Sequence, residues 1–156
     1  MNCRGQSVNN GCPPALALQM ATTPGYSGKS LTSKLGIAPG LGILLINHPT
    51  EYFEWVGEGI KKQVVKEGTI PDIVHVFGKD KRQFENAMQS LQPTIRKNRK
   101  LVIWVSWYKK SSGISTDLTE DVIRNFALKH DLVDVKVCAV SDQWSGLKLV
   151  VPLNKR

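Results

Sequence analysis

The chain has 156 residues, a length typical of one folded domain. Hydrophobic residues make up 41% of the sequence and charged residues 22%, which excludes an intrinsically disordered chain. The 21 Lys and Arg residues outnumber the 13 Asp and Glu residues, and the resulting net charge of +8 favours contact with anions. Because no apolar run approaches the ~20 residues of a membrane span, we expect no membrane partner.

The stretch before Met20, "MNCRGQSVNNGCPPALALQ", is rich in Asn, Gly, Pro and Ser and has no hydrophobic period. It predicts a disordered tail or an upstream extension over residues 1–19, followed by a single domain over residues 20–156. One arginine and the short run "ALALQMA" do not make a secretory signal. The three cysteines are odd in number and lack metal-ligand spacing, so we expect a reducing cytoplasm and no metal site.

Continuous apolar runs of strand length predict three strands that are buried on both faces. They are residues 41–47, 72–77 and 101–107. A short helix that ends at Gly36 precedes the first strand, because glycine readily adopts a left-handed cap. A second short helix is predicted over residues 51–56, and the weakly alternating segment 59–68 suits an edge strand.

Two longer segments carry apolar residues at helical spacing. The first, residues 80–93, places its apolar side chains on one face and is expected to end at Pro93. The second, residues 118–130, follows Asp117. We expect Asp117 to cap this helix, because Glu120 stands three residues further on in capping-box spacing.

Residues 133–140 and 145–153 predict a closing antiparallel hairpin. Unalternating strands separated by amphipathic helices are typical of a parallel sheet with helices on both faces. We therefore predict one three-layer α/β domain with a mostly parallel sheet and a C-terminal antiparallel hairpin. The order of elements resembles a shortened Rossmann-like methyltransferase fold, which also ends in a hairpin.

The nucleotide-binding motifs are incomplete. In "GYSGKS", residues 25–30, the first glycine of a phosphate-binding loop falls on Thr23, and Pro24 removes a backbone amide. A methyltransferase places a glycine-rich turn after its first strand, but "NHPTEYFE" contains no glycine. The acid that would hold the cofactor's ribose, Glu67, follows a weak element. We therefore expect no cofactor bound in the usual mode.

The three histidines differ in their surroundings. His75 lies within a buried strand, which is more typical of a hydrogen-bonded core residue than of a catalyst. His130 stands in the last turn of a helix, where a partial positive charge is favourable. His48 follows the carboxyl end of a parallel strand, the edge at which open α/β sheets bind ligands, and is a ligand-binding candidate.

The loop "SWYKKSSGISTD" leaves the third parallel strand at that same edge. Lys109 and Lys110 supply positive charge, the serines supply donors, and the next helix presents free backbone amides, so the loop predicts an anion site. Against this hypothesis, Asp117, Glu120 and Asp121 already supply negative charge to the start of the helix. A helix start satisfied by its own acids is therefore the favoured interpretation of the loop, and a bound anion comes second.

Several long strings are similar to one bacterial family, namely "YSGKSLTSKLGI", "ILLINHP", "LVIWVSWYKK", "TDLTEDVIRNFAL" and "LVDVKVCAVSDQWSGLKLV". Between Tyr26 and Val150 the chain resembles the family called domain of unknown function 3052. The resemblance implies a small cytoplasmic bacterial protein of α/β type. It transfers no catalytic residue, because the family has no established activity. Tyr108 stands where similar proteins often have proline.

We therefore predict a small-ligand-binding or regulatory module with no cofactor and no metal, whose partner is an anionic small molecule. Its site is expected at the carboxyl ends of the first and third strands. The candidate ligand-binding residues are His48, Tyr52, Ser106, Lys109, Lys110 and Trp144. The alternatives are an S-adenosylmethionine-dependent methyltransferase with a nonstandard pocket and nonspecific nucleic-acid binding through the basic surface. The nucleic-acid alternative ranks last because no long basic helix or arginine-rich block is present.

Overall fold

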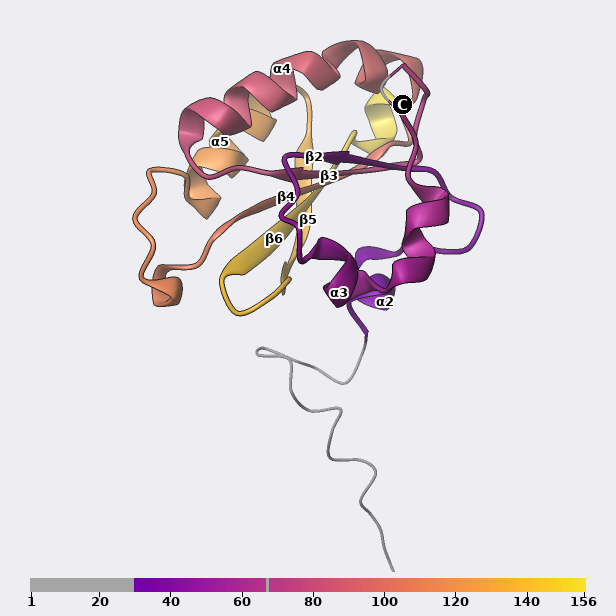
Figure 1. Ribbon diagram of the computed structural model, residues 1–156. Coiled ribbons are helices and arrows are strands. Elements are labelled where there is room, and N and C mark those ends of the chain that lie inside the picture. The colour runs from indigo at the N-terminus through magenta and orange to yellow at the C-terminus, as the bar shows by residue number, and fades with distance from the viewer. Residues whose placement is uncertain (1–29, 67) are drawn as a thin grey trace, which may run out of the picture.

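The computed structural model of the chain describes residues 30–66 and 68–156. The predicted tail, the residues of "GYSGKS" before Ser30, and Glu67 lie outside that part. A five-stranded sheet forms its centre, in the order β2-β3-β4-β6-β5 (Figure 1). The strands are β2 (Ile43–Ile46), β3 (Ile73–Phe77), β4 (Val102–Tyr108), β5 (Val133–Ala139) and β6 (Trp144–Val150).

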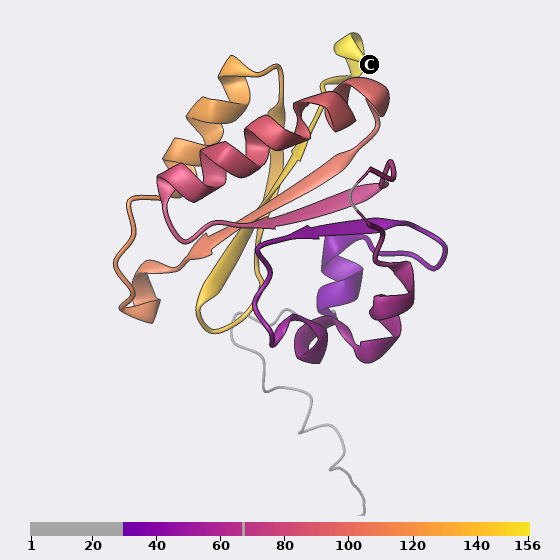
Figure 2. The same ribbon diagram turned by 45° about the horizontal axis from the view of Figure 1, so that its top comes forward.

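The first three strands of the sheet run parallel, and β6 pairs antiparallel with both β4 and β5. Helices cover both faces: α4 and α5 lie on one face, and α2 and α3 on the other (Figures 1 and 2). Their bounds are α2 (Leu31–Leu35), α3 (Tyr52–Val56), α4 (Lys81–Lys97) and α5 (Glu120–Lys129). The predicted three-layer α/β fold with a C-terminal antiparallel hairpin is confirmed.

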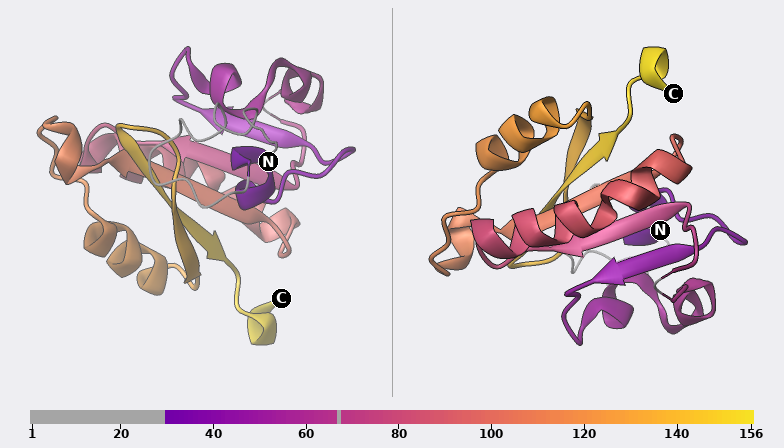
Figure 3. Two further views of the ribbon diagram at one scale, coloured as in Figure 1. Left: turned by 90° about the horizontal axis from the view of Figure 1, so that it is seen from below. Right: turned by 90° about the horizontal axis from the view of Figure 1, so that it is seen from above.

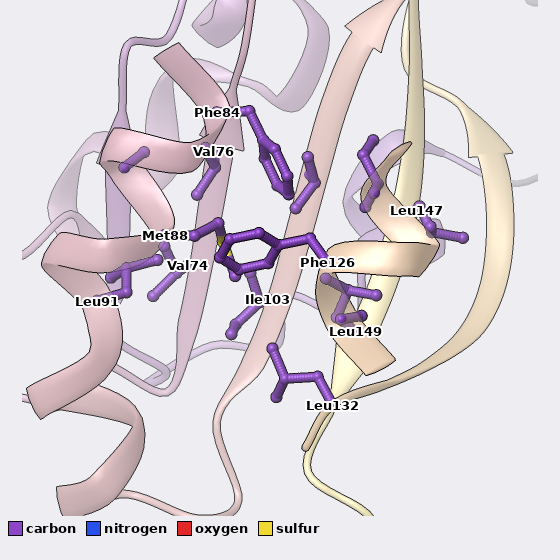
Figure 4. Close-up of a cluster of buried hydrophobic side chains, with 14 of the residues drawn as sticks. Val74, Val76, Phe84, Met88, Leu91, Ile103, Phe126, Leu132, Leu147 and Leu149 are labelled. Atoms are coloured by element: carbon purple, nitrogen blue, oxygen red, sulfur yellow. The ribbon is translucent and has the colours of Figure 1, made fainter. Parts of the chain in front are cut away.

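The layer under α4 and α5 holds the larger of two hydrophobic cores. The two helices lie side by side across the sheet (Figure 3), where Phe84 of α4 meets Phe126 of α5 edge to face at 5.1 Å. Val74 and Ile103 rise from the strands beneath them (Figure 4). Every residue of β3 is buried, as its unbroken apolar run predicted.

The short helices on the other face begin and end where the sequence indicated. Gly36 ends α2 with φ +75°, and its backbone amide bonds to carbonyls of the last turn. At the other end of α2, the Ser30 side chain accepts a hydrogen bond from the Ser33 amide at 3.1 Å. The indole of Trp104 donates to the Leu35 carbonyl at 3.1 Å, which ties α2 to the sheet.

The edge strand predicted over residues 59–68 is wrong. Residues 59–63 belong to a 3-10 helix, η2 (Glu58–Gln63), and of the described residues in the segment only Val64 pairs with the sheet, through a single parallel bridge to Ile43. The weak alternation explains the difference, because Ile60 alone in η2 is buried and the lysines remain exposed. A strand there would have had no apolar face to bury.

The prediction that Pro93 ends the helix over residues 80–93 is also wrong, because α4 continues to Lys97. Pro93 is exposed and removes one backbone hydrogen bond. The next turn keeps Ile95 buried in the core beside Leu91. Burial of one large aliphatic side chain contributes about 1.5–3 kcal/mol, enough to offset most of that loss.

Asp117 does not cap α5. The residue that caps α5 is Thr119, whose hydroxyl accepts a hydrogen bond from the Val122 amide at 3.3 Å. The Asp117 carboxylate instead accepts from the Lys81 amide at 2.8 Å, at the start of α4. Asp117 therefore joins the amino ends of the two helices that cover the same face.

Two smaller features complete the described chain. Cys138 is a free, half-buried thiol, and burial raises its pKa, so the thiol stays protonated. No helix within residues 30–66 and 68–156 is long and apolar enough to cross a membrane.

The turn after β3 needs a glycine at position 78, because the neighbouring side chains leave no space for a Cβ atom there. A Cβ on Gly78 would stand 2.7 Å from Cδ2 of Leu118 and 3.2 Å from Cβ of Phe84, both fully buried. We expect Gly78→Ala to lower the free energy of unfolding by about 1–3 kcal/mol, as overpacking does. Urea denaturation measures this. The matched control is Gly59→Ala, where a Cβ meets no atom within 4 Å, and should stay within about 0.5 kcal/mol of wild type. Equal losses in both variants would contradict the packing argument.

Candidate functional site

A cavity of about 850 Å³ opens at the carboxyl end of β4. The carboxyl ends of β2, β3 and β4 lie along one side of the sheet, which we call the carboxyl edge. The cavity is lined by residues 107–111, 113–116 and 118–121 and by Ser145 of β6. Its wall therefore comes from the end of one strand, the loop that follows, the start of α5 and the neighbouring antiparallel strand.

The loop that forms one wall of the cavity is held by its own hydrogen bonds. The Lys109 amide donates to the Gln143 carbonyl at 2.8 Å, which extends the β4–β6 pairing past the end of β4. The chain then makes a short 3-10 turn, η3 (Lys110–Ser112), which ends at Gly113 with φ +78°. The Ser112 hydroxyl donates to the Lys109 carbonyl at 2.6 Å. Lys109 and Lys110 therefore belong to a turn that its own hydrogen bonds hold in place.

The opposite wall of the cavity is the amino end of α5, which carries negative charge. Glu120 and Asp121 lie in the first turn and line the cavity. Glu120 is ion-paired with Arg124 one turn further on, and Thr119 caps the Val122 amide. The first-turn amides of Glu120 and Asp121 have no partner inside the helix. Both sequence hypotheses therefore keep some support: the helix start is partly satisfied by its own residues, and a cavity with two lysines faces it.

A separate polar cluster lies inside the layer between the sheet and α3. His75 bonds through Nδ1 to the Tyr52 hydroxyl at 3.1 Å and through Nε2 to the Ser106 hydroxyl at 2.7 Å. All three side chains are 1% exposed or less. A neutral imidazole offers one donor and one acceptor, so the ring satisfies both contacts. Ser106 is fully buried, and His75 is a hydrogen-bonded core residue, as the sequence predicted.

Burial decides the protonation of this cluster. Desolvation, with a smaller contribution from the charge of nearby His48, lowers the pKa of His75 to about 3. Burial also raises the pKa of Tyr52 above its ordinary value. His75 and Tyr52 are therefore both neutral at physiological pH, and His75 stacks on Phe77 with ring centroids 4.3 Å apart.

Similar solved structures identify the fold. An uncharacterized protein from Listeria monocytogenes superposes with a TM-score of 0.53 at 7% identity, over 79% of this chain and 66% of that one. The tRNA methyltransferase TrmK of B. subtilis, described as an M1A22 enzyme, superposes with a TM-score of 0.50 at 10% identity, over 82% and 68%. The fold is Rossmann-like and methyltransferase-like.

At such low identity the likeness concerns the fold alone. No protein-family model matches the chain, and no curated protein matches it. The resemblance to domain of unknown function 3052 stays a prediction. Among the described residues, no group of three His, Cys, Asp or Glu side chains is placed to hold a metal ion.

The Rossmann-like fold separates the six candidate residues. Lys109 and Lys110 line the cavity, whereas Tyr52 and Ser106 are buried around His75. His48 is exposed after β2, with its ring edge-on to Tyr52 at 5.9 Å. The remaining candidate, Trp144, is 4% exposed and packs on another ring. They form no single site.

Sequence reasoning also missed residues that line the cavity. Tyr108 packs against Trp144 with ring centroids 4.2 Å apart and lines the cavity at the end of β4. Ser145 lines the cavity because the β4–β6 register places it opposite Trp107. The hairpin was predicted, but its place beside β4 was not, and that pairing is the signal that would have located Ser145.

His75 makes the stability of the fold depend on pH in a defined direction. The pKa of His75 is about 3 when folded and ~6.5 when unfolded, so the unfolded chain binds the proton first as pH falls. The contribution of neutral, buried His75 to the free energy of unfolding is complete above pH ~6.5. It decreases as pH falls toward 3, by up to about 1.4 kcal/mol per pH unit. We expect His75→Gln to flatten the fall in unfolding free energy between pH 6.5 and 5.

Urea denaturation at several pH values measures this dependence. Tyr52→Phe is the matched control, because it removes a hydroxyl from the same cluster yet leaves the imidazole buried, and it should keep the wild-type slope. Equal slopes in wild type and His75→Gln would show that His75 does not carry the effect.

Proposed function

We propose that the chain is a small-ligand-binding Rossmann-like module that takes an anionic small molecule in the cavity at the end of β4. The cavity itself carries the proposal. Its volume of about 850 Å³ lies within the ~300–1,000 Å³ typical of small-molecule sites. Lys109 and Lys110 stand on one wall, at the carboxyl edge where open α/β sheets bind ligands.

The lining supports a ligand with an apolar part as well as a charge. Trp107 and Ile114 give apolar surface, and the hydroxyl of Ser145 supplies a polar group. Ligand sites commonly combine apolar walls with a few placed polar groups. The acids at the start of α5 favour a ligand whose anionic group lies toward the lysines. A small cytoplasmic bacterial protein, as the family resemblance implies, fits this role.

A methyltransferase-like enzyme is the second candidate function, and the likeness to TrmK is the observation that favours it. The turn after β2 argues against it. Asn47 takes the left-handed conformation there with φ +59°, and the His48 ring packs edge-on to Phe53 at 5.8 Å. A methyltransferase keeps this place open with glycine so that the backbone approaches the cofactor. The ligand-binding module is therefore the better-supported reading.

The anion proposal predicts ligand-dependent stabilisation that requires the two lysines. A thermal-shift screen of phosphate, sulfate, nucleotides and carboxylates should raise the Tm of wild type, because a ligand at 100 times its Kd adds about 2.7 kcal/mol. Lys109→Ala with Lys110→Ala should abolish that shift. Lys62→Ala with Lys66→Ala makes the same charge change at exposed positions in and just after η2 and should keep it. No shift in wild type, or equal shifts in all three proteins, would contradict the proposal.

The same reasoning predicts that S-adenosylmethionine does not bind. Calorimetric titration should give no dissociation constant below about 100 μM, which corresponds to roughly −5.5 kcal/mol. Tighter binding would overturn the assignment and favour the methyltransferase. A titration of His48→Gly with Tyr52→Phe would then show whether the side chains after β2 shape that pocket.

A further inference from the structure

A second surface lies at the opposite edge of the sheet, where β2, β3 and β4 begin. Seven positive side chains gather there from three segments. They are Arg96, Lys97, Arg99, Lys100, Lys129, Lys155 and Arg156. We call them the amino-edge basic surface. The segment "RKNRK", residues 96–100, supplies four of them but is too short to be a basic helix by itself.

Hydrogen bonds bring these segments together. The Arg99 guanidinium donates twice to the Lys155 carbonyl, from Nε at 3.3 Å and from Nη2 at 3.0 Å. The Lys155 ammonium contacts the Asp131 carboxylate at 2.5 Å, just past the end of α5. Arg156 donates through Nε to the Val151 carbonyl at 2.9 Å. Figure 2 shows the C-terminal turn beside the end of α4, and the contacts fix it there.

The seven positive side chains of this surface outnumber the carboxylates near it, which include Asp131, Asp72 directly before β3 and Asp134 at the start of β5. Within residues 30–66 and 68–156, Asp131 is the carboxylate that forms an ion pair with a residue of this surface, Lys155. Lys155 and Arg99 lower the pKa of Asp131, which agrees with their closeness. Basic residues are favourable at helix carboxyl ends, and this explains Arg96, Lys97 and Lys129. It does not explain Arg99, Lys100, Lys155 and Arg156, which lie outside both α-helices.

We propose that the amino-edge basic surface binds the phosphodiester backbone of double-stranded nucleic acid without reading its sequence. Arginine forks pair with phosphate oxygens in bidentate fashion. Within the described residues the guanidinium of Arg96 makes no hydrogen bond, whereas those of Arg99 and Arg156 already donate to backbone carbonyls and keep only their remaining N–H groups for phosphate. Single-strand binders use exposed aromatic platforms. The two rings in and just after the last turns of α5, Phe126 and His130, stack on each other with centroids 3.9 Å apart, and Phe126 is buried. The contacts therefore concern phosphates, not bases.

A lipid surface fits less well. Helices that lie on membranes expose an apolar face beside their basic one. The apolar face of α4 is buried against the sheet, and its buried residues extend to Ile95 in the last turns. Leu128 beside Lys129 and Leu153 close to Lys155 are 68% and 80% exposed, but they stand on separate segments and form no apolar helix face. Nucleic acid is consequently the partner that the surface matches.

The test is fluorescence anisotropy with a 20-base-pair duplex of arbitrary sequence, prepared as DNA and as RNA, at several salt concentrations. The variant is Arg96→Gln with Lys97→Gln and Lys100→Gln, three exposed residues without a hydrogen bond from their side chains in the structure. The matched control is Lys79→Gln with Lys81→Gln and Arg82→Gln, at the other end of α4. Both variants lose one arginine and two lysines.

Wild type should bind the duplex at low salt. The amino-edge variant should lose at least tenfold in affinity, and its salt dependence on DNA should weaken by up to about 2.7 logarithmic units per decade of salt, at about 0.9 for each lost phosphate contact. The control should bind as wild type does. Lys109→Ala with Lys110→Ala should also bind normally, so this inference and the cavity proposal fail separately.

Three outcomes would overturn the inference. These are no binding by wild type at 50 mM salt, equal losses in the two triple variants, or binding to vesicles of phosphatidylglycerol and phosphatidylcholine without binding to the duplex. Circular dichroism of each variant should match wild type, because the substituted side chains are exposed.

Discussion

The burial of β4 is the constraint on which the rest of the structure depends. The strand pairs with β3 on one side and with β6 on the other, so both of its edges are occupied. Alternate side chains enter the two cores: Trp104 packs toward α2 and α3, and Val105 toward α4 and α5. The Trp104 indole and the Ser106 hydroxyl then find partners in Leu35 and His75. Apolar burial thus places the few polar groups inside, and hydrogen bonds satisfy them.

The fold was largely predictable from the sequence because its strong signals are local. Unbroken apolar runs such as "LVIWVSW" and the left-handed cap at Gly36 each depend on a few neighbouring residues. The errors arose where tertiary contacts override such signals. Ile95 holds α4 past Pro93 through the core, and Asp117 serves a helix that begins 36 residues earlier in the chain. Ile95 does continue the helical spacing four residues after Leu91, but Pro93 between them indicated an end, whereas the Asp117 contact leaves no trace in residue spacing.

The candidate site was less predictable because position at a sheet edge does not say which way a side chain points. Ser106 and Trp107 are neighbours in sequence, yet one bonds to His75 on the α3 side and the other lines the cavity on the α5 side. Tyr52 lies at the start of α3 and turns inward to the same histidine. The parallel register of β3 with β4 decides these directions, and it is set by pairing between distant segments.

The same strand also links the two surfaces for which functions are proposed. β4 begins beside the amino-edge basic surface and ends at the cavity, roughly 20 Å away at ~3.3 Å per residue. Its register with β6 places Ser145 at the cavity and carries the C-terminal turn to the other edge. A rigid, fully paired strand fixes the distance between the two surfaces but offers no second arrangement that could couple them. A ligand in the cavity and a duplex at the amino edge should therefore bind independently, because coupling requires an element with two states that both partners bias.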